Sequence, residues 1–341
     1  MRLGVVLRDL LPSPGPAPSI AARRMVELSG EAEALGYDSV WITEGTGKES
    51  FAMLGAMAMA TRRVTLGTSI LPILSRPATV TAMAAATLDD LSGGRVTLGL
   101  GTGHPAISEM AHGIALPHPL RAMREYVEAL RLALSGEPTR YVGETLQIQQ
   151  FRLEFTPSHR VPIFIAALGR AMLRLAGALG DGVILTWVPA SRIPWVREQV
   201  ADGARRAGRD PQEVTVVATV RVCVSDEPGV RDAGRRQLAW YAQLPVYARM
   251  WRESGFGDAV DRVTEALGAG VDAAARVVPD EMLDALVAFG GATRLRAHLS
   301  AYRTAGADLP LVYPVPAGAD APLTVLETMR AAAPERGEGE R

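Results

Sequence analysis

A glycine-spaced turn at residues 101–104 carries the first residues in this sequence that suit a ligand site. It follows the apolar run 96–100, which has too little polarity to face solvent and is typical of a strand buried in a parallel sheet. Gly101, Thr102 and Gly103 leave backbone exposed where this strand ends, so a ligand can approach the main chain closely. His104 closes the turn with a titratable side chain. The pattern predicts a ligand site at the carboxyl end of the strand.

A second turn, at residues 167–170, has the features of a phosphate site. It follows the apolar run 162–166 and leads into a predicted helix over residues 171–179. Backbone N–H groups at a helix start attract anions, Gly169 permits close approach, and Arg170 adds positive charge. A plain connection from strand to helix would show the same pattern, so both interpretations stay open.

Eight apolar runs separated by predicted helices position these turns. The runs cover residues 3–7, 39–42, 64–68, 96–100, 162–166, 183–186, 214–224 and 309–313. Crossover helices force parallel pairing and eight strands close a sheet, so the sequence predicts a single (β/α)8 TIM barrel of the α/β class, with insertions after strands four and seven. The barrel domain would span residues 1–332, and residues 333–341 would form a disordered charged tail. A doubly wound sheet is the alternative, but the turn after the first strand is Pro-rich and lacks the G-x-G-x-x-G fingerprint.

Other polar and aromatic residues also follow the predicted strands directly. Thr43 and Glu44 follow strand two, Ser69 and Ile70 follow strand three, and Trp187 follows strand six. Because a barrel places its function at the carboxyl ends of its strands, these residues are expected around one mouth of the barrel.

Two insertions interrupt the alternation of strands and helices. After strand four, residues 105–119 are predicted to form a long loop and residues 141–153 a β-hairpin. After strand seven, residues 229–289 are predicted to be helical with breaks. This second insertion holds an aromatic cluster of Trp240, Tyr241, Tyr247 and Trp251. Such a cluster fits a substrate pocket and equally a packed core or a dimer contact.

Composition excludes several classes of protein. The 341 residues carry a formal net charge of -1, so no basic field favours nucleic acid or an anionic membrane surface. The lone cysteine, Cys223, cannot form an internal disulfide and fits a reducing compartment. The sequence begins directly in the first strand without a signal peptide, and no apolar run is long enough to span a membrane. We therefore predict a cytoplasmic protein.

Three histidines, His104, His112 and His118, lie in or beside the predicted loop 105–119. They lack both the i, i+4 helical spacing and the cysteine partners that are typical of zinc sites. No metal site is therefore predicted.

Four sequence motifs resemble those of one enzyme family. They are WITEG after strand two, LGTSILPILSRPA after strand three, ATLDDLSGGRVTLGLGTGHP around strand four, and VPIFIAALGRAMLRLAGALGDGVILTW across strands five and six. To about Pro316, the chain resembles the bacterial luciferase-like flavin and deazaflavin oxidoreductases. Within that family it is most similar to the coenzyme F420-dependent branch, which includes methylenetetrahydromethanopterin reductase and F420-dependent glucose-6-phosphate dehydrogenase. The resemblance implies hydride transfer to or from coenzyme F420, a small-molecule substrate, a homodimer, and a cofactor-reducing enzyme as an indirect partner.

The same resemblance implies roles for individual residues. A cis peptide bond between Ser69 and Ile70 would support the central ring of the deazaflavin, and the turn at residues 168–170 would contact the cofactor's phosphate. The residues expected to bind the cofactor are Thr43, Ser69, Ile70, Gly101, Thr102, Gly103, Leu168, Gly169, Arg170 and Trp187.

The chain departs at two places from the sugar-phosphate dehydrogenases that it resembles. Those enzymes carry Asp-His after strand two, where this chain has Thr43 and Glu44, and Glu after the GTG sequence, where it has His104. A sugar phosphate is therefore not the expected substrate. Glu44 and His104 are instead the candidate catalytic residues for proton transfer, and His104 is the better donor because the ordinary pKa of histidine lies near neutrality. The alternative is that Glu44 bonds neighbouring backbone and His104 only packs on the cofactor.

Three functions fit these residues. The first is an F420-dependent oxidoreductase that reduces a C=C or C=N bond or oxidises an alcohol. The second is an FMN-dependent monooxygenase, which needs a separate reductase to supply reduced flavin. The third is a non-catalytic barrel that binds a flavin-like molecule.

Overall fold

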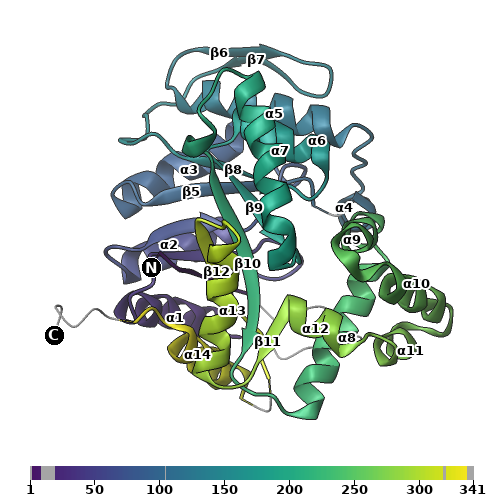
Figure 1. Ribbon diagram of the computed structural model, residues 1–341. Helices are drawn as coiled ribbons and strands as arrows, with labels where there is room; N and C mark the ends of the chain where they lie inside the picture. The colour runs from purple at the N-terminus through teal and green to yellow at the C-terminus, as the bar shows by residue number, and fades with distance from the viewer. Residues whose placement is uncertain (1, 9–19, 104, 318–319, 336–341) are drawn as a thin grey trace.

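The computed structural model describes residues 2–8, 20–103, 105–317 and 320–335. Eight parallel strands form a closed barrel, which confirms the predicted TIM-barrel fold (Figure 1). In spatial order they are β1 (Gly4–Leu7), β2 (Ser39–Ile42), β3 (Thr65–Thr68), β5 (Val96–Gly101), β8 (Ile163–Ala166), β9 (Gly182–Thr186), β10 (Thr215–Cys223) and β12 (Leu309–Pro314). The sheet closes because β12 pairs in parallel with β1, Gly4 lying opposite Leu311.

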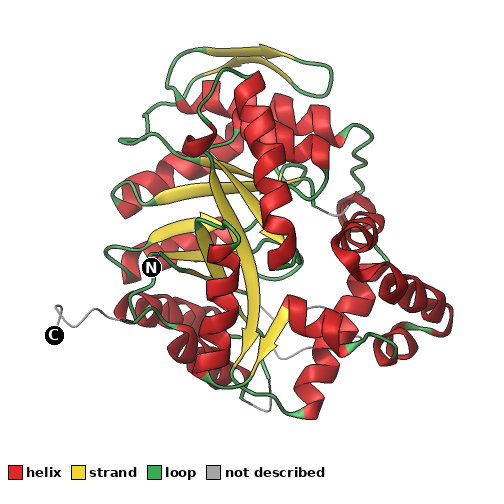
Figure 2. Cartoon of the chain, viewed as in Figure 1, coloured by secondary structure: helices red, strands yellow, loops and turns green. Residues whose placement is uncertain are grey.

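Helices between the strands cover the outside of the barrel (Figure 2). They are α1 (Ala22–Ala34), α2 (Ser50–Ala60), α3 (Ala78–Ser92), α5 (Pro119–Leu134), α6 (Arg170–Leu179), α7 (Ile193–Arg206), α13 (Ala292–Thr304) and α14 (Ala321–Ala332). Because side chains alternate along a strand, Val5 of β1 joins the core beneath the helices while Val6 joins a smaller cluster inside the barrel. Trp41 belongs to the inner cluster and lies across Gly67 of β3, where a Cβ would be 2.2 Å from the indole ring. Glycine is therefore required at position 67.

The predicted β-hairpin is present outside the barrel. Its strands β6 (Thr139–Val142) and β7 (Gln147–Phe151) pair antiparallel. Glu125 of α5 holds the hairpin turn, since its buried carboxylate accepts hydrogen bonds from the backbone N–H groups of Glu144, Thr145 and Leu146. Burial raises the pKa of Glu125, but the hydroxyl and N–H donors of the turn outweigh it and lower the pKa overall. The hairpin is thus fixed to α5.

The segment between β10 and α13 is helical along most of its length and extends to one side of the barrel (Figure 1). Its helices are α8 (Pro228–Ala242), α9 (Pro245–Trp251), α10 (Gly257–Ala266), α11 (Val271–Arg276) and α12 (Asp280–Leu286). The prediction of helix up to residue 289 is wrong at its end, where β11 (Val287–Phe289) is a strand. It pairs with residues 221–223 of β10, beyond the stretch of β10 that pairs with β9. The apolar β-forming sequence there fills an edge that β9 leaves open.

The prediction of a long loop over residues 105–119 is also wrong in part, because residues 105–112 form helix α4 (Pro105–His112). Proline suits the first turn of a helix, and eight residues are too few to show a clear helical period in the sequence. The Pro-rich segment after β1 and residues 336–341 of the predicted tail lie outside the described residues.

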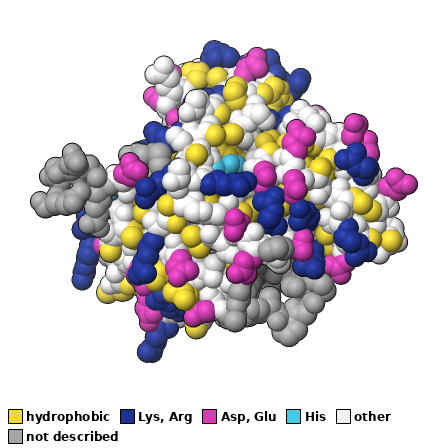
Figure 3. Space-filling model, turned by 60° about the horizontal axis from the view of Figure 1, so that its bottom comes forward, with side chains coloured by type: hydrophobic (Ala, Val, Ile, Leu, Met, Phe, Trp, Pro, Cys, Tyr) yellow, Lys and Arg dark blue, Asp and Glu magenta, His cyan; other side chains and the backbone are white. Residues whose placement is uncertain are grey.

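The described surface is mixed in charge. Acidic, basic and apolar side chains are interspersed on the face drawn in Figure 3. Among the described helices, none is both long enough and apolar enough to cross a membrane.

Candidate functional site

A cavity of about 1950 Å³ lies at the carboxyl ends of the barrel strands. Its lining includes the following predicted cofactor-binding residues: Thr43, Ser69, Ile70, Gly101, Thr102, Gly103, Leu168, Gly169 and Arg170. Glu44 also lines it. The structure thus brings together strand ends that lie far apart in the sequence, as expected for a barrel.

The end of β2 holds the turn that follows β3. The peptide bond between Ser69 and Ile70 is cis, as the resemblance implied. The Thr43 hydroxyl donates a hydrogen bond of 2.9 Å to the Ser69 carbonyl, and the Glu44 N–H donates one of 3.3 Å to the Ile70 carbonyl. Two neighbouring strand ends therefore form one hydrogen-bonded wall of the cavity.

The Ile70 side chain packs directly on Gly101 of β5. A Cβ at Gly101 would lie 2.7 Å from both Cγ1 and Cδ1 of Ile70, so a larger residue would displace that side chain. Gly103 has a φ of 66°, in the left-handed region that favours glycine. The glycine turn and the Ser69–Ile70 turn therefore make one continuous surface.

The turn before α6 leaves an open helix N-terminus at the cavity. Gly169 is the N-cap residue and supplies no capping side chain to the N–H groups of the first helical turn. A Cβ added at Gly169 would meet a single atom within 4 Å, the Arg249 Nη2 at 3.9 Å. Arg170 and Arg249 both line the cavity there. Two guanidinium groups and a helix N-terminus favour an anion at this turn.

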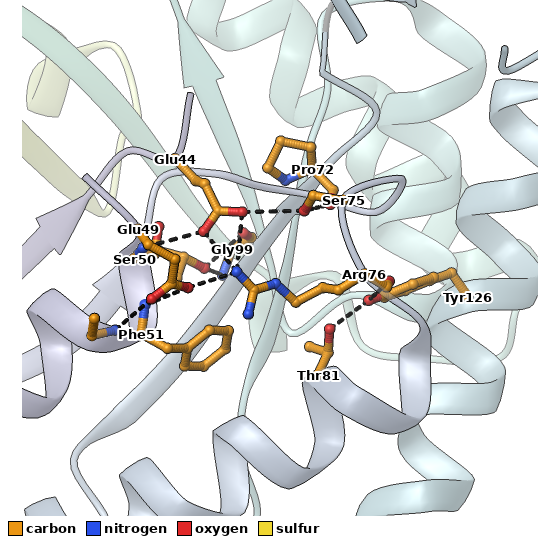
Figure 4. Close-up of polar contacts among 12 residues, drawn as sticks. Glu44, Glu49, Ser50, Phe51, Pro72, Ser75, Arg76, Thr81, Gly99 and Tyr126 are labelled. Atoms are coloured by element: carbon orange, nitrogen blue, oxygen red, sulfur yellow. Dashed lines mark hydrogen bonds and ion pairs between the residues drawn. The ribbon is translucent and has the colours of Figure 1, made fainter. Parts of the chain in front are cut away.

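Glu44 is already engaged by polar partners within the protein (Figure 4). Its side chain is 10% exposed, and its carboxylate pairs with Arg76 at 3.2 Å. It also accepts hydrogen bonds from the Ser75 hydroxyl and from the Ser50 N–H at the start of α2. Arg76 pairs in addition with Glu49 at 2.6 Å, so its charge is shared between two carboxylates.

Among the predicted site residues that the structure describes, Trp187 is not one of those that line the cavity. His104 lies outside the described residues. Trp187 is 1% exposed, with a backbone φ of 58°, and its ring lies beneath the guanidinium group of Arg221. The structure therefore places Trp187 behind a cavity residue instead of at the cavity surface.

Comparison with known proteins identifies the family. A family model described as luciferase-like monooxygenase matches residues 1–309. The chain belongs to this family. A Mycobacterium tuberculosis protein assigned by its name to the coenzyme F420-dependent oxidoreductases is 32% identical over 320 residues, covering 84% of this chain and 89% of that protein. The 5,10-methylenetetrahydromethanopterin reductase of Methanolobus tindarius is 35% identical over 230 residues, covering 67% of this chain and 68% of the relative.

The fold of this luciferase-like chain is shared with a solved enzyme. The structure of coenzyme F420-dependent tetrahydromethanopterin reductase from Methanopyrus kandleri superposes with a TM-score of 0.81 and covers 97% of both chains. The sequence identity is 22%, so this likeness concerns the fold alone.

Sequence reasoning missed a charged residue that lines the cavity of the luciferase-like barrel. Arg221 lies in the apolar run 214–224, where the surrounding valines indicated only a buried strand. In the structure, Thr219 and Arg221 line the cavity, while Val220 and Val222 between and beyond them face the core under the helices. An alternation of two polar residues within an apolar strand was the signal that could have identified this inward face.

The aromatic residues of the insertion after strand seven take two of the roles left open by the sequence, the lining of a pocket and the packing of the core. Trp240, Tyr241 and Tyr247 line the cavity. Trp251 is fully buried and donates a hydrogen bond of 2.8 Å to the Trp187 carbonyl, so it belongs to the core. The helices α8 and α9 therefore supply one wall of the cavity in addition to their packing.

Proposed function

We propose that this luciferase-like protein is a coenzyme F420-dependent oxidoreductase that transfers a hydride between the deazaflavin and a small organic molecule. The observation that carries the proposal is the joining of two features on one cavity. One is the wall of Ile70 and the glycine turn, and the other is the open N-terminus of α6. The names of the relatives support F420 as the cofactor.

The residues of the cavity fit a flat ring with a phosphate-bearing side chain. Ile70 and the backbone of residues 101–103 would hold the ring, since glycine has no side chain to project from that surface. Gly169, Arg170 and Arg249 would hold the phosphate, since they combine free backbone N–H groups with positive charge. When bound, the deazaflavin supplies the hydride acceptor or donor.

Proton transfer in this proposal belongs to Glu44 and His104. Glu44 lines the cavity and is the candidate proton acceptor through its carboxylate. His104 follows Gly103 of the glycine turn directly in sequence and is the candidate donor. The reaction would be reduction of a C=C or C=N bond, or oxidation of an alcohol, in a homodimer supplied with reduced cofactor by a separate enzyme.

An FMN-dependent two-component monooxygenase is the second candidate, because the matching family model is described as a monooxygenase. A non-catalytic flavin-binding barrel is the third, and it predicts cofactor binding without turnover.

The experiment that separates the cofactors is an equilibrium titration of the purified protein with F420 and with FMN, followed by fluorescence. F420 should bind at least about tenfold more tightly than FMN, a difference of about 1.4 kcal/mol. Replacing Arg170 by Ala should weaken F420 binding by about tenfold, because a charge-assisted contact to phosphate is lost. Arg174→Ala is the matched control, since Arg174 lies one turn later on α6 and pairs with Asp202. Tight FMN binding without F420 binding would contradict the proposal.

A further inference from the structure

The base of the cavity holds a buried cation that has no carboxylate partner among the residues that the structure describes. Four residues that line the cavity form this base, which we name the arginine floor: Arg8, Thr186, Arg221 and Tyr313. Arg221 is 2% exposed, and no described carboxylate forms an ion pair with it. Most buried charges in proteins are paired, because an isolated one is costly.

Two aromatic rings hold the Arg221 guanidinium group. Its Cζ atom lies 3.4 Å from the ring centre of Trp187 and 4.6 Å from that of Tyr313. The rings attract the cation through their faces, but they offer nothing to its N–H groups. Nη2 donates a hydrogen bond of 3.3 Å to the Thr186 hydroxyl, and Nε has no hydrogen-bond partner among the described residues. A guanidinium group with five N–H donors therefore makes a single hydrogen bond to the described residues.

A second cation lies next to the first. The Arg8 Nη1 donates a hydrogen bond of 3.3 Å to the Tyr313 hydroxyl. Burial lowers the pKa of Arg221, the phenol oxygens of Tyr313, Tyr241 and Tyr247 raise it, and the charge of Arg8 lowers it again. Arginine nevertheless stays protonated in proteins, so the arginine floor carries positive charge that the described residues do not neutralise.

We propose that the arginine floor binds a carboxylate group of the substrate. This inference rests on the proposed function, because it assigns a substrate class to the same cavity. A guanidinium group that lies over aromatic rings presents its remaining donors in one plane, which matches the two oxygens of a planar carboxylate. A tetrahedral phosphate would direct further oxygens out of that plane and toward the rings. The aromatic residues Tyr241 and Tyr247 then surround the apolar body of the substrate.

Benzoate and its neutral analogue benzamide serve as probes for the carboxylate. Each is titrated into the F420-loaded protein at constant ionic strength, and binding is followed by calorimetry. Benzoate should bind at least about tenfold more tightly than benzamide. In Arg221→Met this preference should fall to within about twofold, while the affinity for F420 stays unchanged.

Arg192→Met is the matched control variant. Arg192 also lines the cavity, is 7% exposed and lies 4.0 Å from the Trp195 ring centre, but its guanidinium group is already paired with Glu253. Its replacement should leave the preference for benzoate intact. Thermal unfolding of each variant checks that the barrel is folded, and Arg221→Lys, which should retain part of the preference, substitutes if Arg221→Met does not fold.

Three results would overturn the carboxylate site. They are equal binding of benzoate and benzamide to the unaltered protein, a benzoate preference that survives in Arg221→Met, and a loss of F420 affinity in Arg221→Met, which would assign Arg221 to the cofactor. If F420 fails to bind any form of the protein, the proposed function fails. The benzoate comparison on cofactor-free protein then still decides whether the arginine floor binds a carboxylate.

Discussion

Arg221 lines the cavity, Arg76 pairs with the cavity residue Glu44, and the two arginines lie in environments of opposite kinds. Arg76 lies over the Phe51 ring at 5.1 Å and is paired with two carboxylates, those of Glu44 and Glu49. Arg221 lies over the rings of Trp187 and Tyr313 and has no carboxylate partner among the described residues. An arginine whose charge is neutralised within the protein contributes to architecture, whereas one that is buried without a counter-charge is available to a ligand.

The contacts around Arg76 show what its ion pairs position. Glu44 follows β2. Glu49 is the N-cap residue of α2, and its side chain accepts hydrogen bonds from two N–H groups of that helix. The Arg76 carbonyl accepts a hydrogen bond of 3.1 Å from the Tyr126 hydroxyl of α5. Arg76 therefore joins the end of β2, the start of α2 and the outer helix α5 beside the cavity (Figure 4).

Removal of the Arg76 charge should have the largest effect on stability. Arg76→Met leaves the Glu44 carboxylate, which is 10% exposed, without its cationic partner. We expect the free energy of unfolding to fall by about 2 kcal/mol, between the values for surface and fully buried ion pairs. Urea unfolding followed by circular dichroism measures this. Adding Glu44→Gln should restore part of the loss, and a decrease below about 0.5 kcal/mol would show that the ion pair is not structural.

Removal of the Arg221 charge should have a smaller effect and the opposite sign. Arg221→Met breaks no described ion pair and removes a charge from a buried site, and the Met sulfur can pack against the Trp187 ring. The free energy of unfolding of the cofactor-free protein should stay constant or rise by up to about 1 kcal/mol. Arg192→Met should instead lower it, because Glu253 loses its partner. A decrease of more than about 1 kcal/mol in Arg221→Met would mean that Arg221 stabilises the fold.

The sequence predicted those strands and turns of the molecule that depend on a local pattern of residues. Apolar runs between helical segments indicated all the barrel strands, because buried parallel strands are apolar on both faces. The turns at Gly101 and Gly169 were found because glycine and a strand end are both visible in sequence. Helix α4 and strand β11 were missed because one is short and the other depends on an edge of β10 that only the closed barrel defines.

The arginine floor was beyond prediction for a different reason. Whether Arg221 is paired depends on which residues of β1, β9 and β12 meet it inside the barrel, and those strands are distant in sequence. Trp187 was expected at the cavity because it follows a strand. Its backbone is instead left-handed, with a φ of 58°, and its ring lies under the guanidinium group of Arg221. Side-chain direction at a strand end is set by such backbone detail, which residue type does not reveal.

Acid should weaken the ion pairs of Arg76 with Glu44 and Glu49, and this is the smallest of the expected effects. Burial raises the pKa of Glu49, but the N–H groups of Ala52 and Phe51 and the charge of Arg76 lower it further, so the pKa lies below its ordinary 4.5 in the folded protein. The ionised carboxylate therefore stabilises the fold fully above that ordinary value, and the contribution is lost as the pH falls through the lowered folded pKa.

Glu49→Gln isolates this contribution because the amide does not titrate. Between about pH 5 and pH 2, the free energy of unfolding of Glu49→Gln should decrease less steeply than that of the unaltered protein. The two decreases should differ by only about a few tenths of a kcal/mol, because the Glu49 side chain is 46% exposed. The effect of Glu49→Gln on this acid slope, the decrease in free energy of unfolding with falling pH, can also be measured in the Arg76→Met variant. It should vanish there if Arg76 is the main cause of the lowered pKa of Glu49, and persist if the two N–H donors of α2 are the main cause. Arg221→Met should leave the acid slope unchanged, because no described carboxylate pairs with Arg221. A change of acid slope in Arg221→Met would therefore reveal a carboxylate partner and remove the distinction between the two arginines.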